Sequence, residues 1–213
     1  MSYTLHHYFR SSCSWRVRIA LAWKGLPFEV VPVHLLRDEQ HAATHRRLNP
    51  SEQVPVLIVD GTTALAQSLA ILEYLEEVHP APALLPSLPV QRARARQMAE
   101  VVNSGIQPLQ NLQVLQSLER DFGLSADQAR SFARSAISRG LVALEALLRE
   151  HSGTCALGDS VSIADLCLVP QLYNARRFDV DLTAMPTAVR VERHLLGLPA
   201  FAATHPDRET VPV

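Results

Sequence analysis

Three small polar residues, Ser11, Ser12 and Cys13, open a segment with the punctuation of a helix. Serine often begins helices, and a glycine and a proline stand where this one should end. The first turn of a helix leaves backbone N–H groups without partners and carries roughly half a unit of positive charge. An anion beside these residues would be stabilised, and a serine hydroxyl can donate a hydrogen bond to a thiolate. The chemistry that these residues could support is therefore the stabilisation of an anion, for example the thiolate of a bound thiol.

The elements around this helix start alternate in the order β-α-β and then β-β-α. Residues 3–9 and 28–35 have the pattern of short strands on either side of the helix. Two further β-rich runs are joined by Asp60-Gly61, a dipeptide typical of hairpin turns, and another helix follows from about Ser68. This order predicts an α/β domain of the thioredoxin-like type.

A proline-rich stretch divides the chain. Four of the fourteen prolines fall within residues 80–89, which cannot continue a helix and are typical of a semi-rigid linker. Beyond this stretch the hydrophobic periodicity is helical almost throughout. We therefore expect a thioredoxin-like domain over residues 1–81, a linker over 82–90 and an all-α domain over 91–213.

One signature in the second half is specific to folding. Ser162 and Asp165 have the spacing of a helix-capping box, and Val161 and Leu166 occupy the two positions of a hydrophobic staple. This pattern predicts a helix that begins at Ser162, and it indicates a structural element rather than a site.

Composition is that of an ordinary globular protein. A net charge of −1, with 19% charged and 47% hydrophobic residues, gives no electrostatic reason to expect a nucleic-acid or membrane partner. The opening residues lack the pattern of a secretory signal, and no apolar run approaches the roughly 20 residues of a membrane span. We therefore expect a cytoplasmic protein. Three separated cysteines and nine scattered histidines predict neither a disulfide framework nor a metal site.

The thioredoxin-like part, the Pro-rich hinge and the helical part with its capping box together resemble the soluble glutathione transferases. Within them the chain is most similar to the zeta class, whose founding activity is maleylacetoacetate isomerase. The run SSCSWRVRIAL resembles the signature of that class, and further similar segments follow in family order as far as residue 187: NPSEQVP, QSLAILEYLEE, GIQPLQNL, ADLCLVPQ and FDVDLTAMPT. The resemblance implies the glutathione transferase fold, glutathione as cofactor and a homodimer.

The resemblance also implies that the helix start is catalytic. We expect Ser11 to be the main donor to the glutathione thiolate, Ser12 to assist it, and Cys13 either to tune the site or only to pack. If these contacts lower the thiol pKa by about two units from about 8.5, the thiolate gains roughly 2.7 kcal/mol and becomes the major form at neutral pH. The pattern Ser-Ser-Cys-Ser lacks the second cysteine of a Cys-x-x-Cys pair, which argues against dithiol redox chemistry.

Glutathione contacts are implied at matching positions along the chain. Val54-Pro55 matches a cis-proline pair whose preceding backbone groups hold the cysteinyl part as an added strand. Gln67-Ser68 matches a helix start that receives the γ-glutamyl carboxylate. The implied glutathione residues are Ser11, Gln40, Val54, Pro55, Gln67, Ser68, Gln107 and Asn111.

The reaction implied by the family is a reversible addition. Glutathione thiolate would add to the cis double bond of a conjugated dicarbonyl acid, the new single bond would rotate, and elimination would return glutathione and the trans isomer. The substrate carboxylates need cationic partners, for which guanidinium groups are suited. The family has arginine at the positions of Arg10 and Arg177, with the adjacent Arg176 as an alternative. Arg16 and Arg18 are expected on the helix surface or in ion pairs.

Several functions remain open beside the isomerisation of maleylacetoacetate in tyrosine and phenylalanine breakdown. The same site could isomerise maleylpyruvate or act as a transferase on α-halo acids, because the sequence specifies the thiolate better than its acceptor. A non-enzymatic interaction module would be expected to lack Ser11, Val54-Pro55 and Gln67-Ser68, all of which are present. The ending HPDRETVPV lacks the Gln-Pro-Asp common in family tails, so a role of the tail in closing the site stays open.

Overall fold

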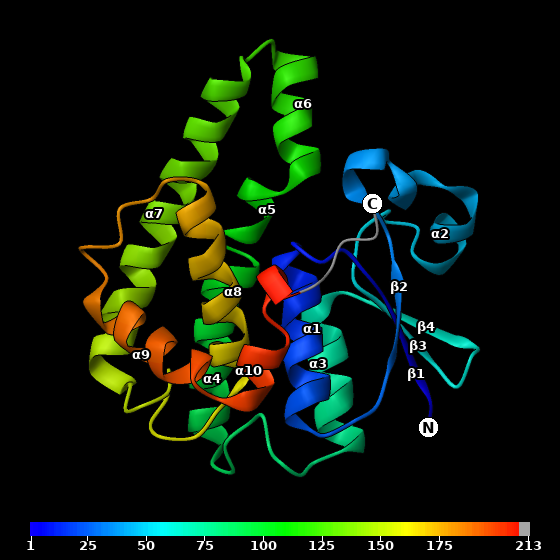
Figure 1. The fold of residues 1–213 in the computed structure, drawn as a ribbon. Helices are drawn as coiled ribbons and strands as arrows, with labels where there is room; N and C mark the ends of the chain where they lie inside the picture. The colour runs from blue at the N-terminus through cyan, green and yellow to red at the C-terminus, as the bar shows by residue number, and fades with distance from the viewer. Residues whose placement is uncertain (209–213) are drawn as a thin grey trace. The chain divides into compact units, whose positions relative to one another are not determined.

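The computed structural model describes residues 1–208, which form two compact units (Figure 1). Of the described residues, 1–84 together with 197–208 form one unit, and 85–196 form the other. Each unit has its own buried apolar core. Among the helices of the described residues, none is long and apolar enough to cross a lipid bilayer.

A four-stranded mixed sheet in the order β2-β1-β3-β4 forms the base of the first unit. Its strands are β1 (Tyr3–His7), β2 (Glu29–Pro32), β3 (Val56–Val59) and β4 (Thr63–Ala66). The β1 strand pairs parallel with β2 and antiparallel with β3, which pairs antiparallel with β4. Parallel neighbours need a crossover connection, and the helix α1 (Ser12–Trp23) supplies it. The predicted thioredoxin-like order is confirmed.

The hairpin between β3 and β4 forms where the sequence predicts it. Asp60 and Gly61 have φ values of 49° and 70°, and the N–H of Thr62 donates to the carbonyl of Val59 at 3.1 Å. Positive φ at both central positions matches the right-handed twist of the two strands, which explains the Asp-Gly dipeptide. The chain then enters α3 (Ser68–Val78), which packs against α1. Between β2 and β3 lie short elements: η1 (Leu35–Arg37), η2 (Glu39–His41) and α2 (Ala43–Leu48).

Most of α1 is buried, and this excludes one of the two alternatives expected for its arginines, a position on the helix surface. Arg16 and Arg18 are 0% and 2% exposed, so they do not lie on the helix surface. The reason is that α1 packs against α3 and also against α10 (Pro199–Ala203), which leaves it little solvent-facing surface. The guanidinium of Arg18 donates to the carbonyls of Phe9 and Thr204 and lies 3.0 Å from Nδ1 of His7.

The C-terminal part of the described chain belongs to the first unit, whereas the sequence placed residues 91–213 together. The indole N–H of Trp15 donates to the hydroxyl of Thr204 at 3.0 Å, and the rings of Trp15 and His205 meet edge to face. The 3-10 turn η3 (Pro206–Arg208) follows. Helical periodicity predicts that α10 is a helix, but it does not predict that this helix packs against α1 of the first unit. Residues 209–213 of the predicted tail lie outside the described residues.

Among its described residues the second unit contains helices and no β-strand. Its helices are α4 (Pro89–Asn103), α5 (Gln107–Gln110), α6 (Leu112–Phe122), α7 (Ala126–His151), α8 (Ile163–Arg177) and α9 (Pro186–Leu196). The α4 helix begins inside the predicted linker, because proline is well accommodated in the first turn of a helix, where its missing N–H is not needed. Buried side chains fill most of α8, which packs against α4, α7 and α9.

The predicted capping box starts α8. The Asp165 carboxylate accepts hydrogen bonds from the N–H groups of Ser162 at 2.8 Å and Ala156 at 2.7 Å. Val161 and Leu166, the predicted staple residues, are both buried. Burial raises the pKa of the Asp165 carboxyl to about 6, although the hydrogen bonds oppose this shift. Asp165 therefore connects the preceding loop to the helix start.

Candidate active site

Ser11 is the N-cap of α1, as the sequence predicts. Its backbone is extended, with φ −67° and ψ 119°, and its hydroxyl oxygen accepts a hydrogen bond from the N–H of Ser14 at 3.2 Å. A hydroxyl that accepts in this way still has its own proton to donate. The side chain is partly exposed, so a ligand can reach it.

The next two residues differ in accessibility. Ser12 is 4% exposed and belongs to the buried part of α1, whereas Cys13 is partly exposed and forms no disulfide. Ser11 and Cys13 are therefore the predicted catalytic residues that a ligand can touch most readily. The sequence alone predicts Ser12 as a catalytic residue beside Ser11 and Cys13, because it does not show which side of the first helical turn is buried.

The strand register brings three predicted segments to one end of the sheet. His6 of β1 pairs with Val56 of β3, which pairs with Ala66 of β4. The β1 strand therefore ends where β3 begins and where β4 ends. The end of β1 leads into the loop before Ser11, and the end of β4 leads into Gln67. The Val54-Pro55 pair leads into the start of β3. These three segments therefore lie at the same end of the sheet.

Val54 and Pro55 are joined by a cis peptide bond, as the resemblance implies. Pro55 is buried and Val54 is partly exposed, immediately before the first residue of β3. Gln40 is 5% exposed in the segment that follows β2, and its Nε2 lies 3.5 Å from Oδ1 of Asp38.

The start of α3 combines an exposed residue and a buried one. Gln67 is the N-cap, is exposed and has a φ of 70°, a left-handed conformation that is uncommon for side chains other than glycine. Such local strain often occurs at ligand sites. Ser68 is 4% exposed, and its Oγ accepts a hydrogen bond from Nη1 of Arg16 at 3.0 Å.

Gln107 is the first residue of the short helix α5 in the second unit, and Asn111 follows its last residue. Asn111 is the N-cap of α6, and its side-chain oxygen accepts from the N–H of Gln113 at 3.0 Å. The Oε1 of Gln107 accepts from Nε2 of Gln110 at 2.7 Å. Gln110 in turn forms a buried reciprocal pair with Gln171, with two hydrogen bonds of 2.9 Å. This pair cannot be recognised from the sequence alone, although both residues fall in segments that resemble the family.

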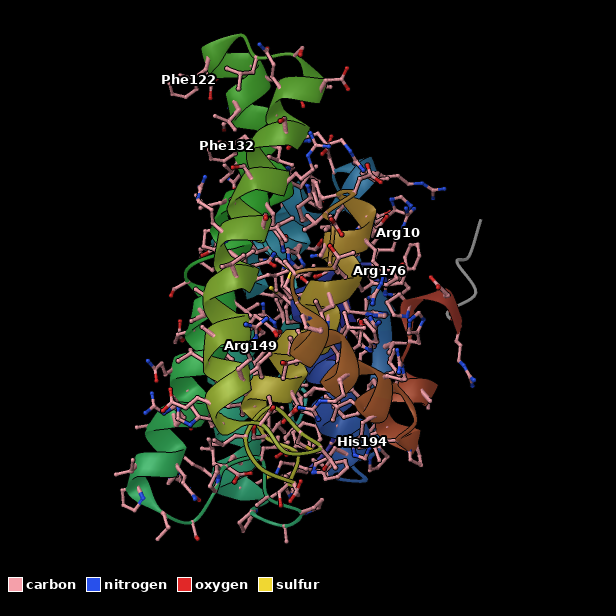
Figure 2. The ribbon with its side chains drawn as sticks, turned by 90° about the vertical axis from the view of Figure 1, so that its left-hand side faces the viewer. Arg10, Phe122, Phe132, Arg149, Arg176 and His194 are labelled. Atoms are coloured by element: carbon pink, nitrogen blue, oxygen red, sulfur yellow. The ribbon has the colours of Figure 1, made fainter. Side chains whose placement is uncertain are left out.

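The arginines proposed for substrate differ in their surroundings. The guanidinium of Arg10 lies 5.0 Å from the ring centre of Phe9, and its side chain is partly exposed. Arg177 is exposed at the end of α8, where its Nη1 donates to Oδ1 of Asn174 at 3.3 Å. Arg176, which is labelled in Figure 2, binds the buried carboxylate of Glu192 through both of its terminal nitrogens. Hydrogen bonding to Glu192 raises the pKa of Arg176.

Comparison with known proteins gives consistent matches. The family model described as "Glutathione S-transferase, N-terminal domain" matches residues 10–78. Maleylacetoacetate isomerase of Rattus norvegicus is 49% identical over 96% of this chain and 93% of its own length. The crystal structure of maleylacetoacetate isomerase from Anaeromyxobacter dehalogenans with bound glutathione is 49% identical, with a TM-score of 0.89 and coverage of 99% and 97%. A holo structure of maleylpyruvate isomerase, a bacterial zeta-class protein, is 38% identical, with a TM-score of 0.94 and coverage of 99% and 100%.

Proposed function

We propose that this chain, which belongs to the zeta class of the glutathione transferase family, is a glutathione-dependent isomerase that converts maleylacetoacetate to fumarylacetoacetate. Glutathione transferase activity accompanies this reaction, as the name of a zeta-class relative from Euphorbia esula indicates. The observation that carries the proposal is the meeting of Ser11, Val54-Pro55 and Gln67 at one end of the sheet. An interaction module would have no need of this combination.

Glutathione fits these residues because each of its polar parts meets a group of the right kind. The backbone of Val54 pairs with the cysteinyl part as an added strand. Gln67 and Ser68 hold the γ-glutamyl carboxylate at the start of α3, where backbone N–H groups favour an anion. Gln40, Gln107 and Asn111 provide further polar contacts. When bound, glutathione supplies a thiolate that adds reversibly to a cis double bond and so permits rotation about it.

Ser11 holds the proton that stabilises this thiolate. Since its oxygen accepts from Ser14 N–H, the O–H is polarised and oriented for donation to a ligand. The positive end of α1 acts in the same direction. Ser12 supports Ser11 from within the helix packing, and Cys13 borders the sulfur. Together these groups lower the pKa of the bound thiol.

Arg10 and Arg177 bind the carboxylates of the substrate. A dicarboxylate that approaches an anionic thiolate meets repulsion, which fixed cations offset in a partly desolvated site. Arg176 is the weaker candidate because its guanidinium is already engaged by Glu192.

A second substrate is supported by a specific likeness. The zeta-class maleylpyruvate isomerase structure has a TM-score of 0.94 with this chain, although the sequence identity is 38%. Both substrates are cis acids with a conjugated carbonyl group, so the same arginines would serve either. The test is a comparison of kcat/KM for purified maleylacetoacetate and maleylpyruvate, each with and without glutathione. We expect activity to require glutathione and to favour maleylacetoacetate, and a preference for maleylpyruvate would reverse the assignment.

We further propose that the enzyme is a homodimer and that it works in the cytoplasm on an intermediate of tyrosine and phenylalanine catabolism. Light scattering should give about twice the 23.5 kDa mass of one chain at micromolar concentration. A value near the mass of one chain would contradict the dimer.

A further inference from the structure

Arg16 is a buried cation that connects the starts of two helices in the first unit. Its exposed fraction is 0%, and its Nη1 donates to Oγ of Ser68 at 3.0 Å. Burial of a charged side chain is unfavourable unless hydrogen bonds compensate for it. One hydrogen-bond partner of Arg16 is the first residue of α3, so the position of Arg16 bears directly on that helix start.

The direction of this hydrogen bond determines where the Ser68 hydroxyl can point. A guanidinium only donates, so the oxygen of Ser68 must be the acceptor. The hydroxyl proton of Ser68 is therefore directed away from Arg16, and the described residues provide no acceptor for it. Donation from a cation also makes the hydroxyl a better donor.

The same guanidinium links the two ends of the proposed glutathione site. Arg16 follows Ser12 by four residues, so both side chains lie on one face of α1. The N-terminus of α1 carries Ser11, the proposed thiolate donor, while the N-terminus of α3 carries Gln67 and Ser68. The hydrogen bond from Arg16 to Ser68 therefore connects the N-terminal half of α1 to the start of α3.

We propose that Arg16 is a positioning residue for the γ-glutamyl carboxylate of glutathione, acting through the oriented hydroxyl of Ser68. This inference rests on the proposed function, because it presumes that glutathione binds at the start of α3. It adds to the proposed site a buried residue that does not itself touch the ligand.

The test compares two ligands that differ only at the carboxylate. Calorimetric titration measures the Kd of glutathione and of an analogue whose γ-glutamyl α-carboxylate is replaced by a carboxamide. Arg16→Met should weaken glutathione about 10- to 100-fold, because the Ser68 hydroxyl is no longer oriented and its hydrogen bond to the charged carboxylate is lost. The same variant should change the affinity for the analogue by less than about 3-fold. In a Ser68→Ala background, Arg16→Met should add less than about 3-fold to the loss for glutathione, because the hydroxyl that it orients is gone.

Arg18→Met is the matched control, since Arg18 is equally buried in α1 but binds His7, Phe9 and Thr204 instead of Ser68. It should weaken both ligands to a similar extent. Equal losses of both ligands in Arg16→Met, or no loss of either, would overturn the proposal.

Thermal unfolding shows whether each variant folds. If Arg16→Met does not, Arg16→Lys replaces it, since lysine keeps the charge and only donates. Arg16→Lys should then weaken the affinity for glutathione by a smaller factor and leave the affinity for the analogue unchanged. Unchanged affinities for both ligands, or equal losses for both, would overturn the proposal. If the wild-type protein binds neither ligand, the proposed function itself is wrong; if it binds glutathione and Arg16→Met shows no selectivity, only the role of Arg16 is wrong.

Discussion

The hydroxyl oxygen of Ser11 accepts a hydrogen bond from the N–H of Ser14 at 3.2 Å, so one side chain caps α1 and presents a donor proton at the proposed thiolate site. Ser11 therefore has a structural role as the cap of α1 and a proposed chemical role as the donor to the thiolate. The two roles can be separated, because other residues cap a helix without offering a hydroxyl.

Ser11→Ala should impair both roles. We expect a loss of about 1 kcal/mol in the free energy of unfolding from the missing cap. Turnover should fall about 10²-fold from the missing donor, and the pH at which bound glutathione ionises should rise. Ser11→Asn should recover the stability, since asparagine is an equally good cap, without recovering turnover. Urea unfolding and pH–rate profiles measure the two effects, and a Ser11→Ala enzyme with normal turnover would contradict the assignment.

Cys13→Ala should change activity much less than Ser11→Ala. The thiol of Cys13 is partly exposed at the first turn of α1, where it borders the proposed sulfur position but is a weaker hydrogen-bond donor than a hydroxyl. Steady-state kcat/KM for the two variants makes the comparison. A severe loss in Cys13→Ala beside a nearly normal Ser11→Ala would reverse the roles of these residues.

Arg177→Ala should lower kcat/KM for maleylacetoacetate, with a loss of transition-state stabilisation of roughly 1.5 to 3 kcal/mol. It should leave glutathione affinity nearly unchanged. Arg177→Lys should restore only part of the loss, because an ammonium lacks the guanidinium fork. Arg176→Ala is the matched control. It leaves the buried carboxylate of Glu192 without its bidentate partner and should reduce stability by about 1 kcal/mol, since the arginine side chain is half exposed. Loss of activity in Arg176→Ala alone would move the assignment by one residue.

Acidification should destabilise the first unit through His7. Burial, and then the neighbouring Arg18, lower the pKa of His7 to about 4. Because an unfolded histidine has a pKa near 6.5, unfolding takes up a proton between about pH 6.5 and pH 4. The stability contributed by neutral His7 is thus present above about pH 6.5 and is lost as the pH falls toward 4, by up to about 3 kcal/mol.

Urea unfolding at pH 7 and pH 4.5 measures this loss. His7→Asn keeps an acceptor for Arg18 but does not titrate, so its stability should fall less on acidification than that of the wild type. The exposed His194, labelled in Figure 2, provides the control variant His194→Asn, which should behave like the wild type. An unchanged pH dependence in His7→Asn would contradict this account.

Thr204→Val should destabilise the protein although it conserves volume. The hydroxyl of Thr204 accepts from the buried indole N–H of Trp15 and donates to the carbonyl of Ala200. Valine would leave the indole N–H without this partner, at a cost of about 1 to 3 kcal/mol. Trp15→Phe with Thr204→Val should be less destabilising than the sum of the two single variants, because the unpaired donor is removed as well. Additive losses in denaturant unfolding would argue against the link between α1 and the C-terminal segment.

Local features of the fold could be predicted from the sequence by itself. Ser11 begins a helix, Asp60-Gly61 turns a hairpin, and Asp165 completes a capping box, each as expected. These features depend on backbone conformation and on hydrogen bonds between residues no more than four positions apart, so a short stretch of sequence contains all the necessary information. The family, its fold and glutathione as cofactor could also be predicted, because similar segments recur in order along the chain.

Only the tertiary structure determined which side chains are buried and what they bind. Arg16 and Arg18 are polar residues within a helix, and the sequence gives no sign that two other helices cover them. The pairing of Arg176 with Glu192, and the packing of the segment after Gly197 on α1, likewise join residues far apart in the chain. Such contacts depend on how elements pack, because the partner of a buried group is determined by spatial proximity and not by sequence distance.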